Sequence, residues 1–150
     1  MGNARVSYKN FIVSDVTNCP ELWQNKDPVR PHLSDSFRTN KGRVVLSLHN
    51  GSTHAAFLCL AKTIKVPVDE KKLDEYSDSS GHIGVPYSVW SYMPGAGKTL
   101  VNRVINMAEE KYGIKRVVTL SPKTAMAKRF HLKNGAKELS LNKDSVNFEY

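Results

Sequence analysis

A glycine-containing turn, Met93-Pro-Gly-Ala-Gly-Lys-Thr99, is the stretch of this sequence best suited to hold a ligand. A β-branched and aromatic run, 83–93, precedes it, and apolar residues at helical spacing follow over 100–113. Glycine lets the backbone approach an anion closely, and the first amides of a helix have no partner within the helix. Because those amides and the helix dipole point toward the turn, the sequence predicts an anion site between a strand and a helix.

The letters Gly-Ala-Gly-Lys-Thr also suggest a nucleotide-binding P-loop. That motif needs a glycine where this chain has Tyr92. The sequence also lacks a later strand that ends in an apolar run followed by an aspartate for Mg²⁺. A nucleotide is therefore the less favoured ligand, and Lys98 needs no role in phosphoryl transfer.

The segment that runs from the turn to Ala136 resembles the core of the GNAT superfamily, the acetyl-coenzyme A-dependent N-acyltransferases. The family's loop pattern is Arg or Gln, two residues, Gly, one residue, then Gly or Ala, and residues 92–97 match it except at their first position. Three successive elements agree in order and spacing over about a third of the chain, which is more specific than the loop alone. The matches are the buried helix face Leu100, Val101, Val104, Ile105 and Ala108, the strand 116–120, and the Ala-x-x-Phe-Tyr-x-x-x-Gly-Phe pattern at 127–136.

The resemblance implies a single α/β domain over residues 1–150, with a mixed, mostly antiparallel sheet flanked by helices. The expected order is β-α-α-β-β-β-α-β-α-β-β. The strings VPYSVWSY and FHLKNGA are also similar to small GNAT-like proteins encoded by bacteriophages.

In such a fold the acyl donor, acetyl-coenzyme A, runs along the end of the fourth strand. Backbone groups of that strand would pair with the pantetheine amides, and the amides of the turn would hold the pyrophosphate. The implied binding residues are Ser91, Tyr92, Met93, Gly95, Ala96, Gly97, Lys98, Thr99 and Thr124.

The reaction implied by the resemblance is direct attack of a primary amine on the thioester. Such a reaction needs a base for the amine, donors for the oxyanion and a proton for the departing thiolate. Many relatives protonate the thiolate with a tyrosine, where this chain has His131, and a histidine can supply a proton near neutral pH. No acidic residue lies on the fourth strand, so His82, Tyr87 or a relayed water remain open as the base. Replacement of the tyrosine also leaves open a non-catalytic binding or structural protein.

Composition narrows the other function classes. The chain has 150 residues, of which 40% are hydrophobic and 24% charged, as expected for one globular domain. The first ten residues lack a secretory signal, so we expect a cytoplasmic protein. We also expect neither a membrane segment nor a metal site. The protein is expected to be either a monomer or a homodimer. The net charge of +8 favours anionic partners, and coenzyme A is preferred over nucleic acid because the basic residues are scattered. Cys59, within an apolar run, is expected in the core.

The remaining elements follow from local patterns. We expect a first strand over 5–13 and two short helices over 20–26 and 31–40, whose Trp23 and Phe37 either line the acceptor site or, more favoured, anchor the helices to the sheet. An Asn50-Gly51 turn predicts a hairpin of strands 43–49 and 54–62, and a polar turn predicts a last hairpin after Gly135. The acidic insertion 63–81, with one or two helical turns, is a lid or, more commonly, a solvated surface loop.

Overall fold

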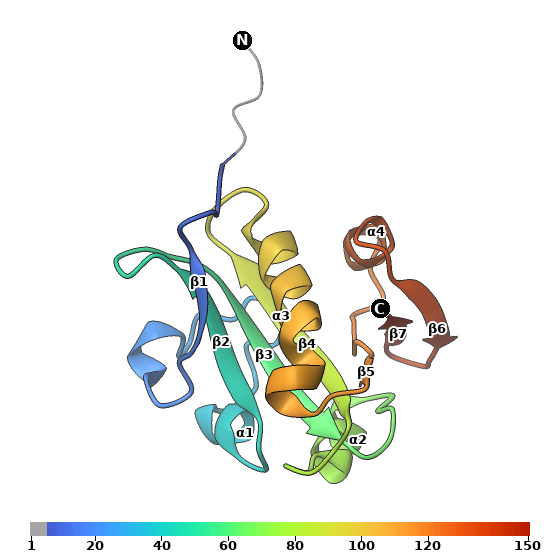
Figure 1. Ribbon diagram of the computed structural model, residues 1–150. Coiled ribbons are helices and arrows are strands. Elements are labelled where there is room, and N and C mark those ends of the chain that lie inside the picture. The colour runs from blue at the N-terminus through green and yellow to red at the C-terminus, as the bar shows by residue number, and fades with distance from the viewer. Residues whose placement is uncertain (1–5) are drawn as a thin grey trace.

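The computed structural model describes residues 6–150, which form a five-stranded sheet with helices on both faces and a separate hairpin beyond one edge (Figure 1). In chain order the elements are β1 (Ile12–Asp15), the 3-10 helix η1 (Pro20–Leu22), α1 (Asp35–Thr39), β2 (Val44–His49), β3 (His54–Thr63), α2 (Glu70–Tyr76), β4 (Ile83–Ser91), α3 (Ala96–Tyr112), β5 (Arg116–Val117), α4 (Ala125–Lys133), β6 (Lys137–Leu141) and β7 (Val146–Glu149). Within this part of the chain, no helix is long and apolar enough to cross a membrane.

The sheet has the order β1-β2-β3-β4-β5, antiparallel from β1 to β4, with β5 parallel to β4. The predicted mixed, mostly antiparallel sheet is therefore confirmed. β6 and β7 pair antiparallel as a second sheet, as the polar turn predicted.

The two faces of the sheet pack into separate cores. On one face lies α3, which buries the predicted positions Leu100, Val101, Val104 and Ala108. On the other face, Trp23 and Leu73 pack against inward-facing residues of β3 and β4. Cys59 is fully buried in this second core, as expected.

α3 is delimited by glycines in the left-handed region. Gly95 precedes it with φ 74°, and Gly113 ends it with φ 67°. Residues other than glycine rarely adopt such angles, so the sequence sets the length of the helix at both ends. This places the first turn of α3 directly after the end of β4.

β4 and β5 pair only at their beginnings. Ile83 is opposite Arg116 and Gly84 is opposite Val117, after which the two strands part. The chain after β5 then bonds to β7 instead, through bridges of Val118 and Ser121. The predicted strand 116–120 is thus a two-residue strand followed by these bridges, and the Leu120 carbonyl, on the edge that faces β4, accepts from the Arg30 side chain instead.

Three sequence predictions near the N-terminus were wrong in extent. The first strand was predicted over 5–13, of which residue 5 lies outside the described residues, and it begins only at Ile12. Tyr8 and Phe11 form a turn, and Tyr8 packs into the core beneath α3, with its hydroxyl donating to the Pro94 carbonyl. The predicted helix 20–26 is a single 3-10 turn, which ends before Asn25 at a left-handed φ of 59°. The predicted helix 31–40 begins only at residue 35, because the Ser34 side chain caps it.

The insertion 63–81 packs against the core at Leu73 and is not solvated along its whole length. It forms α2, an element that the expected order lacked, and Leu73 is fully buried. Ser145 and Asn147 of the last hairpin donate hydrogen bonds to the carbonyls of Val68 and Pro67, at 2.6 and 2.9 Å. The insertion therefore ties the last hairpin to the main sheet.

If the insertion is part of the core, Leu73→Ala should lower the free energy of unfolding by about 2–5 kcal/mol, the usual cost of emptying a buried leucine site. Ile64, which lies in the same insertion and is 50% exposed, provides the control, since its replacement by alanine should change stability little. Denaturant unfolding measures both. If both variants lower the free energy of unfolding only slightly and by the same amount, the insertion is a solvated loop.

Candidate functional site

The divergence of β4 from β5 opens a cleft of about 320 Å³ between them. Its volume falls in the range of small-molecule sites, and its walls are mostly apolar. It extends from the face that carries α3, at Gly97 and Phe130, to the opposite face, at Val29 and Trp90. The other lining residues are Pro86, Tyr87, Ser88, Val89, Ser91, Leu120, Ser121, Pro122, Thr124, Met126, Ala127 and His131.

At one end of the cleft lies the start of α3, where the backbone amides are available. The side chains of Ser34, Asp69 and Thr124 cap α1, α2 and α4, whereas α3 follows Gly95 and has no side-chain cap. The Ala96 amide donates to the Met93 carbonyl at 3.2 Å and the Thr99 amide to the Gly95 carbonyl at 3.1 Å, which leaves the amides of Gly97 and Lys98 as the free donors of this turn within the described chain. Together with the positive end of the helix dipole, they form a suitable cradle for a phosphate group.

The edge of β4 along the cleft also keeps backbone groups free. Its last backbone contact with the β5 segment is the Val118 amide, which donates to the Gly84 carbonyl at 2.9 Å. Beyond that point the strand edge faces the cleft. An extended ligand with amide groups could bond to this edge as an additional strand does.

His131 is the titratable side chain that faces the cleft from α4. Its Nδ1 lies 2.7 Å from the Tyr150 hydroxyl, and its ring stacks on Phe148 at 5.2 Å. Burial lowers the pKa of His131 to about 4, so the imidazole is neutral at pH 7. Since Tyr150 occupies Nδ1, Nε2 is the ring nitrogen left for a ligand.

The wall that β4 contributes has no base in it. A bulge gives β4 one extra residue, Tyr87, between the partners of Cys59 and Leu60. The Tyr87 hydroxyl is buried, and burial raises its pKa well above the ordinary value. The Ser88 hydroxyl is also buried and faces Asp27 without reaching hydrogen-bond geometry. Among the residues that line the cleft there is no carboxylate.

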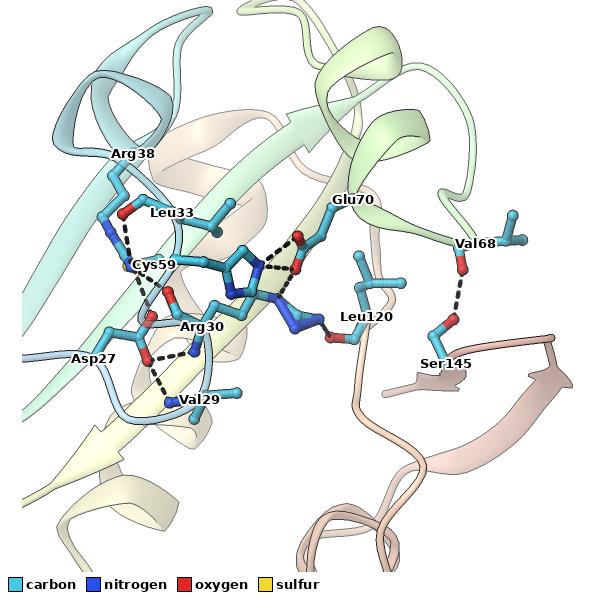
Figure 2. Close-up of polar contacts among 11 residues, drawn as sticks. Asp27, Val29, Arg30, Leu33, Arg38, Cys59, Val68, Glu70, Leu120 and Ser145 are labelled. Carbon is cyan, nitrogen blue, oxygen red and sulfur yellow. Dashed lines mark hydrogen bonds and ion pairs between the residues drawn. The ribbon is translucent and has the colours of Figure 1, made fainter.

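A buried ion pair holds the loop that carries Val29 against the cleft (Figure 2). Asp27 Oδ2 accepts from Arg38 at 2.6 Å, and Asp27 Oδ1 accepts from the amides of Val29 and Arg30 at 2.7 and 3.1 Å. The Arg30 side chain reaches across to the Leu120 carbonyl at 2.7 Å, on the β5 side of the cleft. The loop therefore braces both walls.

Comparison with known proteins gives a match to solved structures only. No protein-family model matches the chain, and no curated protein matches it significantly. The GNAT-like decarboxylase GphF, solved in complex with isobutyryl-CoA, matches with a TM-score of 0.70 and 14% identity, over 93% of this chain and 98% of its own. The chain has the GNAT fold.

Other structures with the GNAT fold match at similar levels. The IAA acetyltransferase of Bacillus cereus gives a TM-score of 0.62 at 10% identity, over 93% of this chain and 99% of its own. The malonyl-CoA decarboxylase of Rhodopseudomonas palustris gives 0.70 at 16% identity, over 96% of this chain. The chain spans 57% of that decarboxylase and 31% of the one from Cupriavidus metallidurans.

The residues predicted from the GNAT resemblance divide into three groups. Ser91, Gly97, Thr124 and His131 line the cleft. The others adjoin it on the turn: Tyr92, Gly95 and Lys98 are exposed, Met93 and Thr99 are partly buried, and Ala96 is buried. His82, one of the possible bases, is exposed and lies outside the cleft. Trp23 and Phe37, the candidates for the acceptor site, also lie outside the cleft.

Trp23 has a clear structural role instead. It is 1% exposed, and its indole nitrogen donates to the Val16 carbonyl at 2.8 Å. Phe37 packs edge-on against Tyr87. Both residues anchor the N-terminal segment to the sheet, which is the interpretation that sequence reasoning favoured.

Sequence reasoning missed the residues that come from the segment after β5 and from the N-terminal loop. Leu120 and Ser121 line the cleft because that segment turns away from β4, and Val29 does so because of the Asp27–Arg38 pair. The position of Ser121, directly after the predicted strand 116–120 and opposite the ligand-bearing strand, was the one available signal.

The Asp27–Arg38 pair gives a test of this bracing. Replacing Asp27 by asparagine leaves the buried Arg38 unpaired, so the free energy of unfolding at pH 7 should fall by about 3–5 kcal/mol. Burial raises the pKa of Asp27, but the facing Ser88 hydroxyl, Arg38 and two backbone amides lower it by more. The pair's contribution is therefore present above the unfolded pKa of about 3.9 and is lost as the pH falls through the lower folded value.

Denaturant unfolding at several pH values measures both effects. The difference between wild type and Asp27→Asn should shrink below about pH 4. Asp35→Asn, at an exposed carboxylate on α1, is the matched control and should change little. A difference that stays constant down to pH 2 would contradict the assignment of the effect to an ionised Asp27.

Proposed function

We propose that this chain is an enzyme that acts on a coenzyme A thioester held in the cleft. The proposal is supported by one arrangement above all, the uncapped first turn of α3 beside the unpaired edge of β4. The turn suits the pyrophosphate, the strand edge suits the pantetheine amides, and the apolar cleft suits the acyl group. Neighbouring folds solved with isobutyryl-CoA and with coenzyme A support the same ligand class.

Decarboxylation of a β-carboxyacyl thioester is the reaction that the cleft favours. The bond from the α-carbon to the carboxyl carbon breaks, carbon dioxide leaves, and the electron pair moves into the thioester carbonyl to form an enolate. This step needs no base; it needs a hydrogen-bond donor at the carbonyl oxygen. The neutral His131 can supply that donor from Nε2, and the enolate then takes a proton at its α-carbon from water.

Transfer of an acetyl group from acetyl-coenzyme A to a primary amine, the reaction expected from the sequence, is the second candidate. The exposed end of β4, at Ser91 and Tyr92, favours it because an acceptor can reach the strand there from solvent. Structural neighbours named as acetyltransferases also favour it. The absence of a carboxylate from the cleft lining weighs against it, since the amine must lose a proton.

The ligand class can be tested by thermal and calorimetric binding. Coenzyme A at about 100 times its dissociation constant should stabilise the protein by about 2.7 kcal/mol, whereas ATP with Mg²⁺ should do little. A Cβ at Gly97 would lie 3.7 Å from Val89 and 3.8 Å from Phe130, so the helix tolerates it. Gly97→Val should therefore abolish coenzyme A binding without unfolding, because its methyl groups enter the cleft, and Gly97→Ala should weaken it less. Stabilisation by ATP alone would restore the nucleotide hypothesis.

The reaction can be tested with two substrates. Malonyl-CoA should release carbon dioxide and yield acetyl-CoA, whereas acetyl-CoA with a panel of primary amines tests thiol release. His131→Phe should lower turnover by about 10² or more while leaving coenzyme A affinity nearly unchanged, the scale expected when a catalytic donor is lost. His82→Phe, an exposed histidine outside the cleft, is the matched control.

Each outcome of this assay has a clear meaning. Thiol release only with an amine would establish the second reaction in place of the first. Coenzyme A binding without turnover of either substrate would favour a non-catalytic binding protein. An unchanged rate in His131→Phe would remove His131 from the mechanism.

A further inference from the structure

Tyr150 follows β7 and is held in place against His131. Its amide donates to the Val117 carbonyl at 3.0 Å, which fixes its backbone to the β5 segment. Its ring meets the His131 ring nearly edge-on, with centroids 5.7 Å apart and an interplanar angle of 78°. The hydroxyl then lies 2.7 Å from His131 Nδ1. The His131–Tyr150 pair therefore joins α4 to the residue after β7 and, through the Val117 carbonyl, to β5.

The direction of this hydrogen bond follows from what each group has to donate. The Tyr150 hydroxyl has one proton, and the acceptor within its reach among residues 6–150 is Nδ1, because the Asn134 side chain that also faces it does so with its amide nitrogen, a donor. If Nδ1 carried the proton instead, the hydroxyl proton would have no acceptor within a partly buried site, which is costly. Burial keeps both groups neutral, since it raises the pKa of Tyr150 to about 12 and lowers that of His131 to about 4. The phenol is thus the donor and Nδ1 the acceptor.

We propose that Tyr150 is a positioning residue that fixes His131 as the tautomer with its proton on Nε2, so that His131 presents an N–H donor to the cleft. A neutral imidazole carries only one proton, so donation from Tyr150 to Nδ1 leaves that proton on Nε2. The fully buried Phe148 ring stacks on the imidazole and so hinders the ring turn that would exchange its two nitrogens.

The role of this tautomer in catalysis rests on the proposed function. An N–H donor at Nε2 can stabilise negative charge on the thioester oxygen or on a departing thiolate, whereas an unprotonated Nε2 would repel it. The tautomer itself is a property of the protein without substrate. Its measurement and the assay of turnover can therefore fail independently.

Nitrogen-15 NMR of protein labelled at histidine reads the tautomer and its titration directly. In the wild type, His131 should show a protonated Nε2 and an unprotonated Nδ1 from pH 6 to 8, with a titration midpoint near pH 4. A wild-type spectrum with the proton on Nδ1, or an even mixture of the two tautomers, would overturn the proposal whether or not any variant folds.

Tyr150→Phe removes only the hydroxyl. The variant should show a mixture of tautomers, and the His131 midpoint should rise, because donation from tyrosine stabilises the neutral ring alone. Turnover should fall about tenfold with KM little changed, since the ring stays in place but its donor is misdirected for part of the time. Tyr112→Phe, which removes a buried hydroxyl without a hydrogen-bond partner in the described chain and outside the cleft, is the matched control.

Two results separate the inference from the proposed function. An unchanged His131 spectrum in Tyr150→Phe would overturn the positioning role, whatever the turnover. A shifted spectrum in a protein that consumes no thioester would keep the role of Tyr150 and reject the enzymatic proposal.

Discussion

The pairing of backbone groups after β5 is the constraint on which the cleft depends. Buried amides and carbonyls must find partners, and a strand next to β4 would normally find them there. In this chain the segment after Val117 bonds to β7, with the Thr119 amide donating to the Phe148 carbonyl at 2.8 Å. On the edge that faces β4, the Leu120 carbonyl accepts from the Arg30 side chain instead of a β4 amide, so β4 is left with a free edge inside the protein. The last hairpin and Arg30 together hold the segment away from β4, although the hairpin contributes none of the residues that line the cleft.

The same arrangement explains why the N-terminal loop and the insertion matter for a site they hardly touch. A hairpin that has left the main sheet needs other contacts to stay in position. The insertion supplies them through the carbonyls of Pro67 and Val68, and Arg30 supplies another through Leu120. The Asp27–Arg38 pair in turn fixes the loop from which Arg30 extends (Figure 2). The width and the shape of the cleft are thus set by polar contacts on the face of the main sheet that is opposite to α3.

Much of the fold near the cleft was predictable because local signals there are strong. Helical spacing from Leu100 to Ala108, glycines at both ends of α3 and the Asn50-Gly51 turn each specify structure within a few residues. The first strand and the early helices were not predictable, because distant contacts override their local pattern. Tyr8 alternates as a strand residue would, yet it is drawn into the core beneath α3.

The candidate site shows the same division. The position of His131 follows from a helix pattern, but its partner Tyr150 is nineteen residues away on another element, and only the fold brings the two together. The pKa of His131 is likewise a property of burial, which the sequence does not encode locally. A histidine with its ordinary pKa of about 6.5 could act as an imidazolium near neutral pH, which the sequence-based hypothesis assumed.

A neutral donor changes which reactions the cleft can assist. With a pKa of about 4, protonating the buried ring costs roughly 3 kcal/mol more than in water, so about one molecule in a thousand carries imidazolium at pH 7. Protonation of a thiolate by imidazolium would then depend on a rare species. A hydrogen bond from Nε2 to a developing enolate needs no such species, and it is strongest in an apolar cleft. The electrostatics of the site therefore favour a reaction in which negative charge forms on the thioester itself over one in which a base must first remove a proton.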